Sequence, residues 1–288
     1  MHKLIENQVR ISVRNLVEFI LRSGDIDNRH STKAQYDAMQ IGSRLHRKIQ
    51  GSMPGTYKAE VSLKHTAHYR DVEILLEGRA DGIITPDEKS VKEEQANLLY
   101  QTQTDGNVSA EILFIIDEIK VIRQDMEKLD SAAQVHVAQA LCYAYMYARV
   151  LNTKAAGVTE RKRGEKKGFV IGIQITYCHP ETEEIKRFLK VYTFKEIKEE
   201  FDYYISEYGK WAQFLYEHRL ERNASVQKLS FPYPYRAGQK RLVAAAYRTM
   251  INGEQLFIQA PTGIGKTLQL YFRLYGQLER SMLIRFFI

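Results

Sequence analysis

Residues 112–122, Ile-Leu-Phe-Ile-Ile-Asp-Glu-Ile-Lys-Val-Ile, consist mainly of β-branched and aromatic side chains. Such a composition predicts a strand within a sheet. Further strand-like runs occur at 58–63, 72–77, 82–85 and 171–177, and segments with helical spacing lie between them. We therefore expect a mixed α/β fold.

Four segments have the apolar spacing of amphipathic helices, at about 11–21, 39–49, 131–151 and 197–215. The stretch 86–110 is polar and shows no periodicity. Because it is long for a loop inside a compact domain, it is interpreted as a hairpin tip, an insertion or a lid over a site.

The composition is that of a folded globular protein, with 44% hydrophobic and 27% charged residues among 288. A chain of this length accommodates about two domains. The predicted division is a first domain at 1–195, a linker helix at 196–228 and a second segment at 229–288. The formal net charge of +7 favours a polyanionic partner.

The two cysteines, Cys142 and Cys178, form no Cys-x-x-Cys pair. Their number excludes a disulfide framework and a four-cysteine zinc or iron–sulfur site. The sequence has no signal-peptide pattern, and no apolar run approaches the roughly 18 residues of a membrane span. The expectation is a cytoplasmic protein without a membrane segment.

The first group of chemically competent residues begins with Asp81, in the run Gly-Arg-Ala-Asp-Gly at 78–82, which is expected on one strand. Glu118 follows 37 residues after Asp81, and Lys120 lies two residues further. Strand side chains alternate, so Glu118 and Lys120 are expected on one face of their strand and Asp117 on the other. If the two strands are neighbours, Asp81 and Glu118 converge. The competing interpretation is a hairpin turn at Asp-Gly and an ordinary solvated strand face.

Two converging carboxylates repel each other unless a cation lies between them, and Mg²⁺ or Mn²⁺ suits oxygen ligands. A bound divalent ion lowers the pKa of water and neutralises charge that develops on a phosphodiester. Lys120 is then placed to hold the water or the phosphate. The pattern therefore favours hydrolysis of phosphodiester bonds.

Two helical segments add candidate residues. His46 could supply a further metal ligand, and Gln139 and Tyr143, four residues apart on one helix face, could orient the carboxylates or grip a nucleic-acid backbone. For each helix the alternative is ordinary packing.

In order along the chain, His46, Glu60, Asp81, the Asp-Glu-Ile-Lys run at 117–120 and the Gln-x-x-x-Tyr run at 139–143 resemble the RecB-like branch of the PD-(D/E)XK nucleases. The resemblance covers about residues 10–195. It implies a restriction-endonuclease-like mixed sheet flanked by helices. The expected substrate of such a nuclease is single-stranded or flapped DNA.

The same resemblance implies roles for single residues. It makes His46, Asp81 and Glu118 metal ligands, with Asp81, Glu118 and Lys120 catalytic. Supporting or DNA-binding residues would be Gln139, Tyr143 and Glu60. Relatives often carry an iron–sulfur cluster on four cysteines, and this chain lacks those cysteines.

The run at 260–267, Ala-Pro-Thr-Gly-Ile-Gly-Lys-Thr, follows a short predicted strand at 255–259 and precedes a predicted helix. A glycine-bearing loop between a strand and a helix surrounds phosphate with backbone N–H groups. Gly263, Gly265, Lys266 and Thr267 are therefore expected to bind the phosphates and Mg²⁺ of ATP.

Upstream, the run Phe-Pro-Tyr-Pro-Tyr-Arg-Ala-Gly-Gln at 231–239 precedes a helix predicted to run through Met250. Residues 229–275 resemble the start of DinG and XPD-type superfamily-two helicases. The resemblance implies that Tyr233, Arg236 and Gln239 approach the adenine. The alternative is a proline-rich turn that caps a helix.

Only 21 residues follow Thr267, too few for the second Mg²⁺ motif, an arginine finger or a second motor domain. The expectation is an incomplete P-loop (RecA-like) segment in a fragment of a longer protein.

Three hypotheses follow. The favoured one is a metal-dependent nuclease within an ATP-dependent nuclease–helicase of DNA repair or defence. The second is a non-catalytic DNA-binding module attached to a helicase. The third is a P-loop nucleotide-binding protein with an unrelated α/β partner domain.

Overall fold

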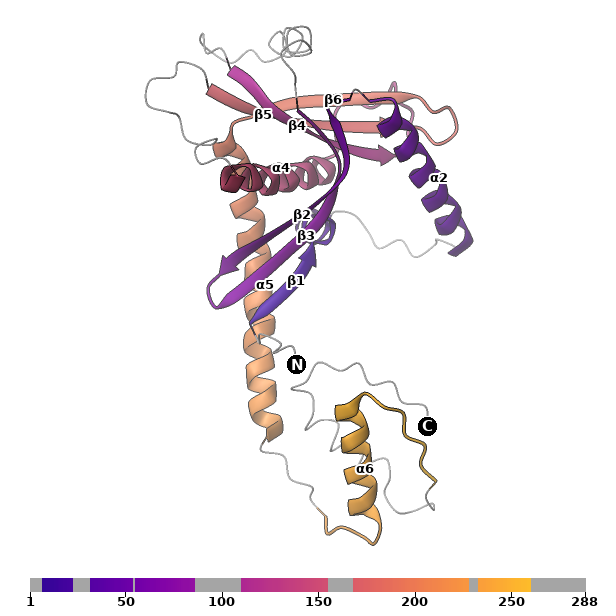
Figure 1. The fold of residues 1–288 in the computed structure, drawn as a ribbon, viewed down its shortest axis with the longest axis vertical. Coiled ribbons are helices and arrows are strands. Elements are labelled where there is room, and N and C mark those ends of the chain that lie inside the picture. The colour runs from indigo at the N-terminus through magenta and orange to yellow at the C-terminus, as the bar shows by residue number, and fades with distance from the viewer. Residues whose placement is uncertain are drawn as a thin grey trace. The chain divides into compact units, whose positions relative to one another are not determined.

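The computed structural model describes residues 7–22, 32–53, 55–85, 110–154, 168–227 and 233–259. The chain divides into two compact units, Met1–Gln213 and Phe214–Ile288. The first unit is an α/β domain with a mixed sheet flanked by helices (Figure 1). Its strands are β1 (Gln8–Ser12), β2 (Tyr57–Tyr69), β3 (Val72–Ile84), β4 (Ala110–Val121), β5 (Gly168–Cys178) and β6 (Ile185–Tyr192).

The helices are α1 (Val13–Leu21), α2 (Thr32–Gly51), α4 (Gln134–Lys154), α5 (Phe194–Gln227) and α6 (Gln239–Asn252). Helix α5 extends from the first unit into the second, and α6 lies in the second. Side chains mark two of the helix starts. Ser12 accepts a hydrogen bond from Asn15 N–H at α1, and Thr193 exchanges hydrogen bonds with Glu196 at α5.

The sheet has the order β1-β3-β4-β5-β6, and β2 pairs with the other edge of β3. The β1–β3 and β4–β5 pairs are parallel, whereas β2–β3, β3–β4 and β5–β6 are antiparallel. Strand β3 is thus the strand that links both halves of the sheet.

Helices α2 and α4 pack on β4 from different sides. Leu45 and Ile49 of α2 pack with Ile119 and Cys178. By contrast, Lys120, the next residue of β4, contacts Gln139 of α4. Because neighbouring strand residues point to opposite faces, the two helices cover opposite faces of β4. Figure 1 shows α4 running along the strands and α2 near one end of the sheet.

Sequence periodicity predicted most of these elements but missed β1. The helix expected at 11–21 begins at Val13, because Gln8–Ser12 pairs in parallel with Glu73–Glu77. The strand runs at 72–77 and 82–85 are parts of one strand, β3. The strand placement of residues 78–82 is thus confirmed, whereas β1 was missed because it forms by pairing with a distant segment, which local spacing does not encode.

The strand expected at 255–259 is absent from the described part of the second unit. Residues 254–259 have no regular structure, and Phe257 is 92% exposed. A short apolar run forms a buried strand only where partner strands accept its backbone hydrogen bonds, and the described residues provide none there.

Candidate functional site

Strand β3 changes partner at the predicted site. Its edge opposite β2 pairs with β1 through Glu77 and with β4 from Gly82 onward. Between these points, no described strand pairs with residues 78–81 on that edge. The β3–β4 ladder comprises only three residue pairs and ends at Gly82 and Asp117. From there the two strands diverge, β3 toward Asp81 and β4 toward Glu118, and we call this divergence the fork.

Asp81 lies at the mouth of this fork. Its Oδ2 atom accepts a hydrogen bond from the backbone N–H of Ile119 at 2.9 Å. The carboxylate thus accepts the hydrogen bond that a backbone carbonyl of β3 would accept if the ladder continued. The other oxygen, Oδ1, lies 3.6 Å from Nδ1 of His46.

Helix α2 places His46 beside Asp81, because adjacent residues of the helix contact different strands. Leu45 and Ile49 are buried against Ile119, and this packing turns His46 toward β3. One turn later, Gln50 Nε2 donates to the backbone carbonyl of Asp81 at 2.9 Å. A cation could therefore meet an imidazole nitrogen and a carboxylate oxygen from two different elements.

Glu118 is almost completely buried, with 1% of its side chain exposed. Its Oε1 atom accepts a hydrogen bond from Lys120 Nζ at 2.7 Å, and its Oε2 atom is buried without a hydrogen-bond partner among the described residues. Burial raises the pKa of Glu118 to about 7, Lys120 opposes this rise, and the charge of Asp81 adds to it. The two carboxylates therefore interact electrostatically across the fork.

Lys120 connects Glu118 to helix α4, because its Nζ atom also donates to Gln139 Oε1 at 3.2 Å. Glu118 and Lys120 were expected on one face of the strand and Asp117 on the other, and the contacts of Asp117 are accordingly with different residues. Gln139 is buried, so the ammonium of Lys120 is held from two sides.

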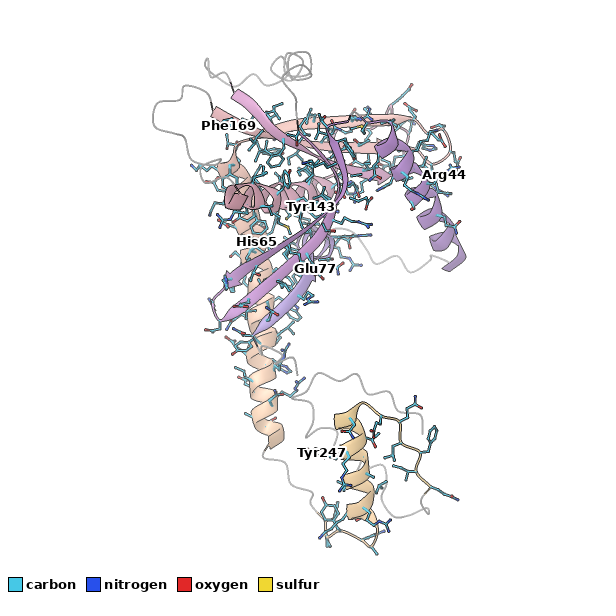
Figure 2. The ribbon with its side chains drawn as sticks, viewed as in Figure 1. Arg44, His65, Glu77, Tyr143, Phe169 and Tyr247 are labelled. Atoms are coloured by element: carbon cyan, nitrogen blue, oxygen red, sulfur yellow. The ribbon has the colours of Figure 1, made fainter. Side chains whose placement is uncertain are left out.

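Tyr143, one turn after Gln139 on α4 and labelled in Figure 2, packs against β3 at Gly78. Its hydroxyl is hydrogen-bonded to Gln139 and to the backbone of Arg79, while burial and the charge of Glu118 raise its pKa. A Cβ atom on Gly78 would lie 2.7 Å from the Tyr143 ring. The first glycine of the Gly-Arg-Ala-Asp-Gly run therefore leaves room for Tyr143.

Glu60 lies beside the site in an unusual backbone conformation. Strands β2 and β3 pair at Ala59–Gly82 and at Val61–Ala80, but not at the intervening Glu60, which has a φ of 56°. Such a conformation is costly for a residue other than glycine and occurs often at functional sites. Its Oε1 atom accepts from Gln50 at 3.0 Å, and its Oε2 atom lies 2.5 Å from Arg79 Nε.

Sequence reasoning missed Tyr57, Gln50 and the surroundings of Asp117. Asp117 is fully buried, where burial raises its pKa, and it accepts hydrogen bonds from Thr176 at 2.5 Å, Gln174 at 3.0 Å and Tyr57 at 3.2 Å. Only the second glycine of the run, Gly82, hinted at this cluster. A Cβ atom there would lie 1.9 Å from the Tyr57 hydroxyl.

The His46–Asp81 pair offers an imidazole nitrogen and a carboxylate oxygen, and the unpartnered Oε2 atom of Glu118 is a further carboxylate oxygen, the ligand type that a hard divalent cation prefers. Within the described ranges, no group of three or more His, Cys, Asp or Glu side chains is placed so that it could hold a metal ion by itself. Mg²⁺ seldom depends on three protein ligands, because it keeps several waters and binds one or two carboxylates together with substrate phosphate. The residues therefore fit Mg²⁺ or Mn²⁺ better than a fully protein-bound zinc ion.

In the second unit, the expected adenine-binding residues form the turn before α6. Gln239 is buried, and its Oε1 atom accepts from Arg236 N–H at 2.5 Å while its own N–H donates to the Arg236 carbonyl at 3.2 Å. Tyr233 is 59% exposed. The expected phosphate-binding residues Gly263, Gly265, Lys266 and Thr267 lie outside the described residues.

No protein-family model matches the chain, and no curated protein matches it. Among solved structures, the crystal structure of SSO0001 aligns with 71% of this chain and 77% of its own, at 16% identity and a TM-score of 0.37. No helix in the described ranges combines the length and apolar character needed to cross a bilayer.

Proposed function

We propose that the first unit hydrolyses phosphodiester bonds of DNA with a divalent cation, Mg²⁺ or Mn²⁺. The observation that carries the proposal is the fork between β3 and β4. There Asp81 meets His46, while Glu118, on the adjoining strand, meets Lys120. We further propose that the mixed sheet and its flanking helices form a restriction-endonuclease-like fold.

His46, Asp81 and Glu118 would hold the cation. When bound, it would lower the pKa of a water molecule and neutralise charge on the scissile phosphate. Before binding, the ammonium of Lys120 compensates one oxygen of Glu118. A phosphate near Lys120 would compete for this ammonium, which Gln139 keeps at the mouth of the site.

Protonation of Glu118 would oppose cation binding. Burial holds the pKa of this carboxyl at about 7, so it carries a proton in a large share of molecules at neutral pH. A second positive charge beside the carboxyl would favour the ionised form. Cation binding is therefore expected to release a proton and to strengthen as the pH rises.

The proposed substrate is single-stranded or flapped DNA, to which the net charge of +7 gives a general attraction. We also propose that the second unit binds ATP as the opening part of a helicase, within a nuclease–helicase of repair or defence. The resemblance of residues 229–275 to the start of such helicases supports this proposal, whereas the hydrogen bonds between Arg236 and Gln239 are those of a turn that caps α6. ATP binding that persists unchanged in a Lys266→Ala variant would count against this assignment.

The test of the nuclease is cleavage of labelled flapped DNA with Mg²⁺, with Mn²⁺ and with a chelator. Asp81→Asn should abolish cleavage while it preserves an oxygen that can accept from Ile119 N–H. Asp125→Asn is the matched control, because Asp125 is an exposed carboxylate outside the fork. Equal recovery of intact substrate from wild type and Asp81→Asn in all conditions would overturn the proposal.

The alternative is a non-catalytic DNA-binding module, which the pairing of Glu118 with Lys120 favours because this contact stabilises the site without a cation. DNA binding without cleavage, equal with chelator and with Mg²⁺, would support that alternative.

A further inference from the structure

The hydroxyl of Tyr57 lies at the point where three strands meet. It contacts the Asp81 backbone carbonyl of β3 at 3.4 Å and the Asp117 Oδ2 atom of β4 at 3.2 Å. Each of these groups adjoins a proposed cation ligand, because Asp81 itself is one and Asp117 precedes Glu118. One side chain of β2 therefore touches both strands of the fork.

The Asp81 carbonyl depends on side chains for its hydrogen bonds. Since β2 and β3 do not pair at Glu60 and Asp81, this oxygen accepts from Gln50 at 2.9 Å. The single proton of the Tyr57 hydroxyl is shared between this carbonyl, at 3.4 Å, and Asp117 Oδ2, at 3.2 Å. The Tyr57 hydroxyl stays protonated at neutral pH, because burial and the neighbouring Asp117 raise its pKa.

The Asp117 side chain is fixed from β5 as well. Gln174 and Thr176 donate to its Oδ1 atom, which leaves Oδ2 for Tyr57. The parallel pairing of β4 with β5 thus gives Tyr57 a rigid anchor. Gly82 provides the space in which the Tyr57 ring lies, since a side chain there would overlap the hydroxyl.

We infer that Tyr57 is a positioning residue that ties β3 to β4 and so fixes the fork from which Asp81 and Glu118 reach the cation. The role of the fork in cation binding rests on the proposed function, whereas the link that Tyr57 makes between β3 and β4 does not. Tyr57 contacts the backbone carbonyl of Asp81 and the carboxylate of Asp117, so its effect on hydrolysis is exerted through other groups.

The tie can be tested without metal through backbone hydrogen exchange in the full chain, with a chelator present. Ile119 N–H reports the fork, because it donates across the fork to Asp81 Oδ2. Tyr57→Phe keeps the ring and removes the hydroxyl, so exchange at Ile119 should accelerate about tenfold. Ile115, which pairs with Ile84 in the β3–β4 ladder, should change less than about twofold.

Tyr69→Phe is the matched control, because it removes a hydroxyl from the other end of β2. It should leave exchange at Ile119 unchanged. The inference is overturned if Tyr57→Phe leaves Ile119 unchanged, or if it accelerates Ile119 and Ile115 equally, as a general loss of stability would.

A second experiment displaces the Tyr57 hydroxyl with a side chain at Gly82. Gly82→Ala should accelerate exchange at Ile119 in the wild-type background, but should add little in a Tyr57→Ala background, where no ring occupies the space. Equal effects of Gly82→Ala in both backgrounds would contradict the inference.

Mn²⁺ binding separates the inference from the proposed function. If both hold, Tyr57→Phe weakens Mn²⁺ binding about tenfold and Tyr69→Phe leaves it unchanged. If wild type binds no Mn²⁺, the proposed function fails, while exchange at Ile119 still decides whether Tyr57 ties the fork. If Tyr57→Phe binds Mn²⁺ as wild type does, the positioning role is overturned.

Discussion

The carboxylate of Asp81 accepts a hydrogen bond from the backbone N–H of Ile119 at 2.9 Å, across the point where β3 and β4 separate. A side chain thereby replaces a strand as the partner of a β4 backbone group. The same carboxylate faces His46 from its other oxygen. Asp81 thus satisfies a backbone N–H of β4 with one oxygen and presents the other to His46 and to the proposed cation.

Glu118→Gln should change how stability depends on pH. Burial raises the folded-state pKa of Glu118 from 4.5 to about 7, so its protonated form is favoured in the folded protein. Its contribution is full below about pH 4.5 and is lost as the pH rises toward about 7. Denaturant unfolding with a chelator should therefore show Glu118→Gln gaining stability relative to wild type as the pH rises from 5 to 8.

Glu127→Gln, at an exposed carboxylate, is the control for this titration. A stability difference between Glu118→Gln and wild type that stays constant from pH 5 to pH 8 would show that the Glu118 pKa is not raised.

The His136 ring should remain neutral at pH values well below the ordinary pKa of a histidine. Burial, aided by the charge of Lys120, lowers its pKa from 6.5 to about 4, and its Nδ1 atom lies 2.8 Å from the Tyr177 hydroxyl. The neutral ring therefore contributes stability above pH 6.5 that is lost as the pH falls toward 4. NMR titration of the ring should give a pKa below 5, and Lys120→Met should raise it; a pKa of 6.5 in both proteins would contradict the contact.

Gly78→Ala should destabilise the first unit by about 1–3 kcal/mol, the usual cost of overpacking. The added Cβ atom would lie 2.7 Å from the Tyr143 ring and would displace it from its contact with Gly78. Gly55→Ala serves as control, since its Cβ atom would have no neighbour within 4 Å. Equal denaturation midpoints for the two variants would show that Tyr143 is not held against Gly78.

Glu183→Gln should strengthen DNA binding. Glu183 in the β5–β6 turn contacts Arg44 at 3.3 Å and also Lys48, and these cations of α2 lower its pKa. Without the carboxylate, both cations become available to phosphate. Binding measured with a chelator at several salt concentrations should show a log–log slope steeper by about one unit; Glu181→Gln is the control, and an unchanged slope would show that α2 does not reach the DNA.

The sequence allowed the strand carrying Glu118 and Lys120 to be predicted, because β-branched composition and alternation are local properties. The contact between Lys120 and Gln139 could not be derived from spacing, since it depends on α4 lying across β4. The same limit explains why β1 and Tyr57 were missed. Each acquires its role only when segments far apart in sequence come together.

The glycines of the Gly-Arg-Ala-Asp-Gly run show what a short pattern can and cannot convey. The run was expected to lie on one strand, and a hairpin turn at Asp-Gly was the competing interpretation. In the structure both glycines lie within β3 and leave room for two tyrosines, Tyr143 at Gly78 and Tyr57 at Gly82. The residue that needs the space is not adjacent in the sequence, so the pattern alone did not identify it.

Paramagnetic NMR with Mn²⁺ tests most directly whether the fork binds a cation. Substoichiometric Mn²⁺ should broaden the backbone signals of Asp81, Glu118 and Ile119 first, and Asp81→Asn should remove this selective broadening. Wild-type spectra in which these three signals survive, or in which exposed carboxylates such as Asp125 broaden equally, would contradict a cation site between β3 and β4.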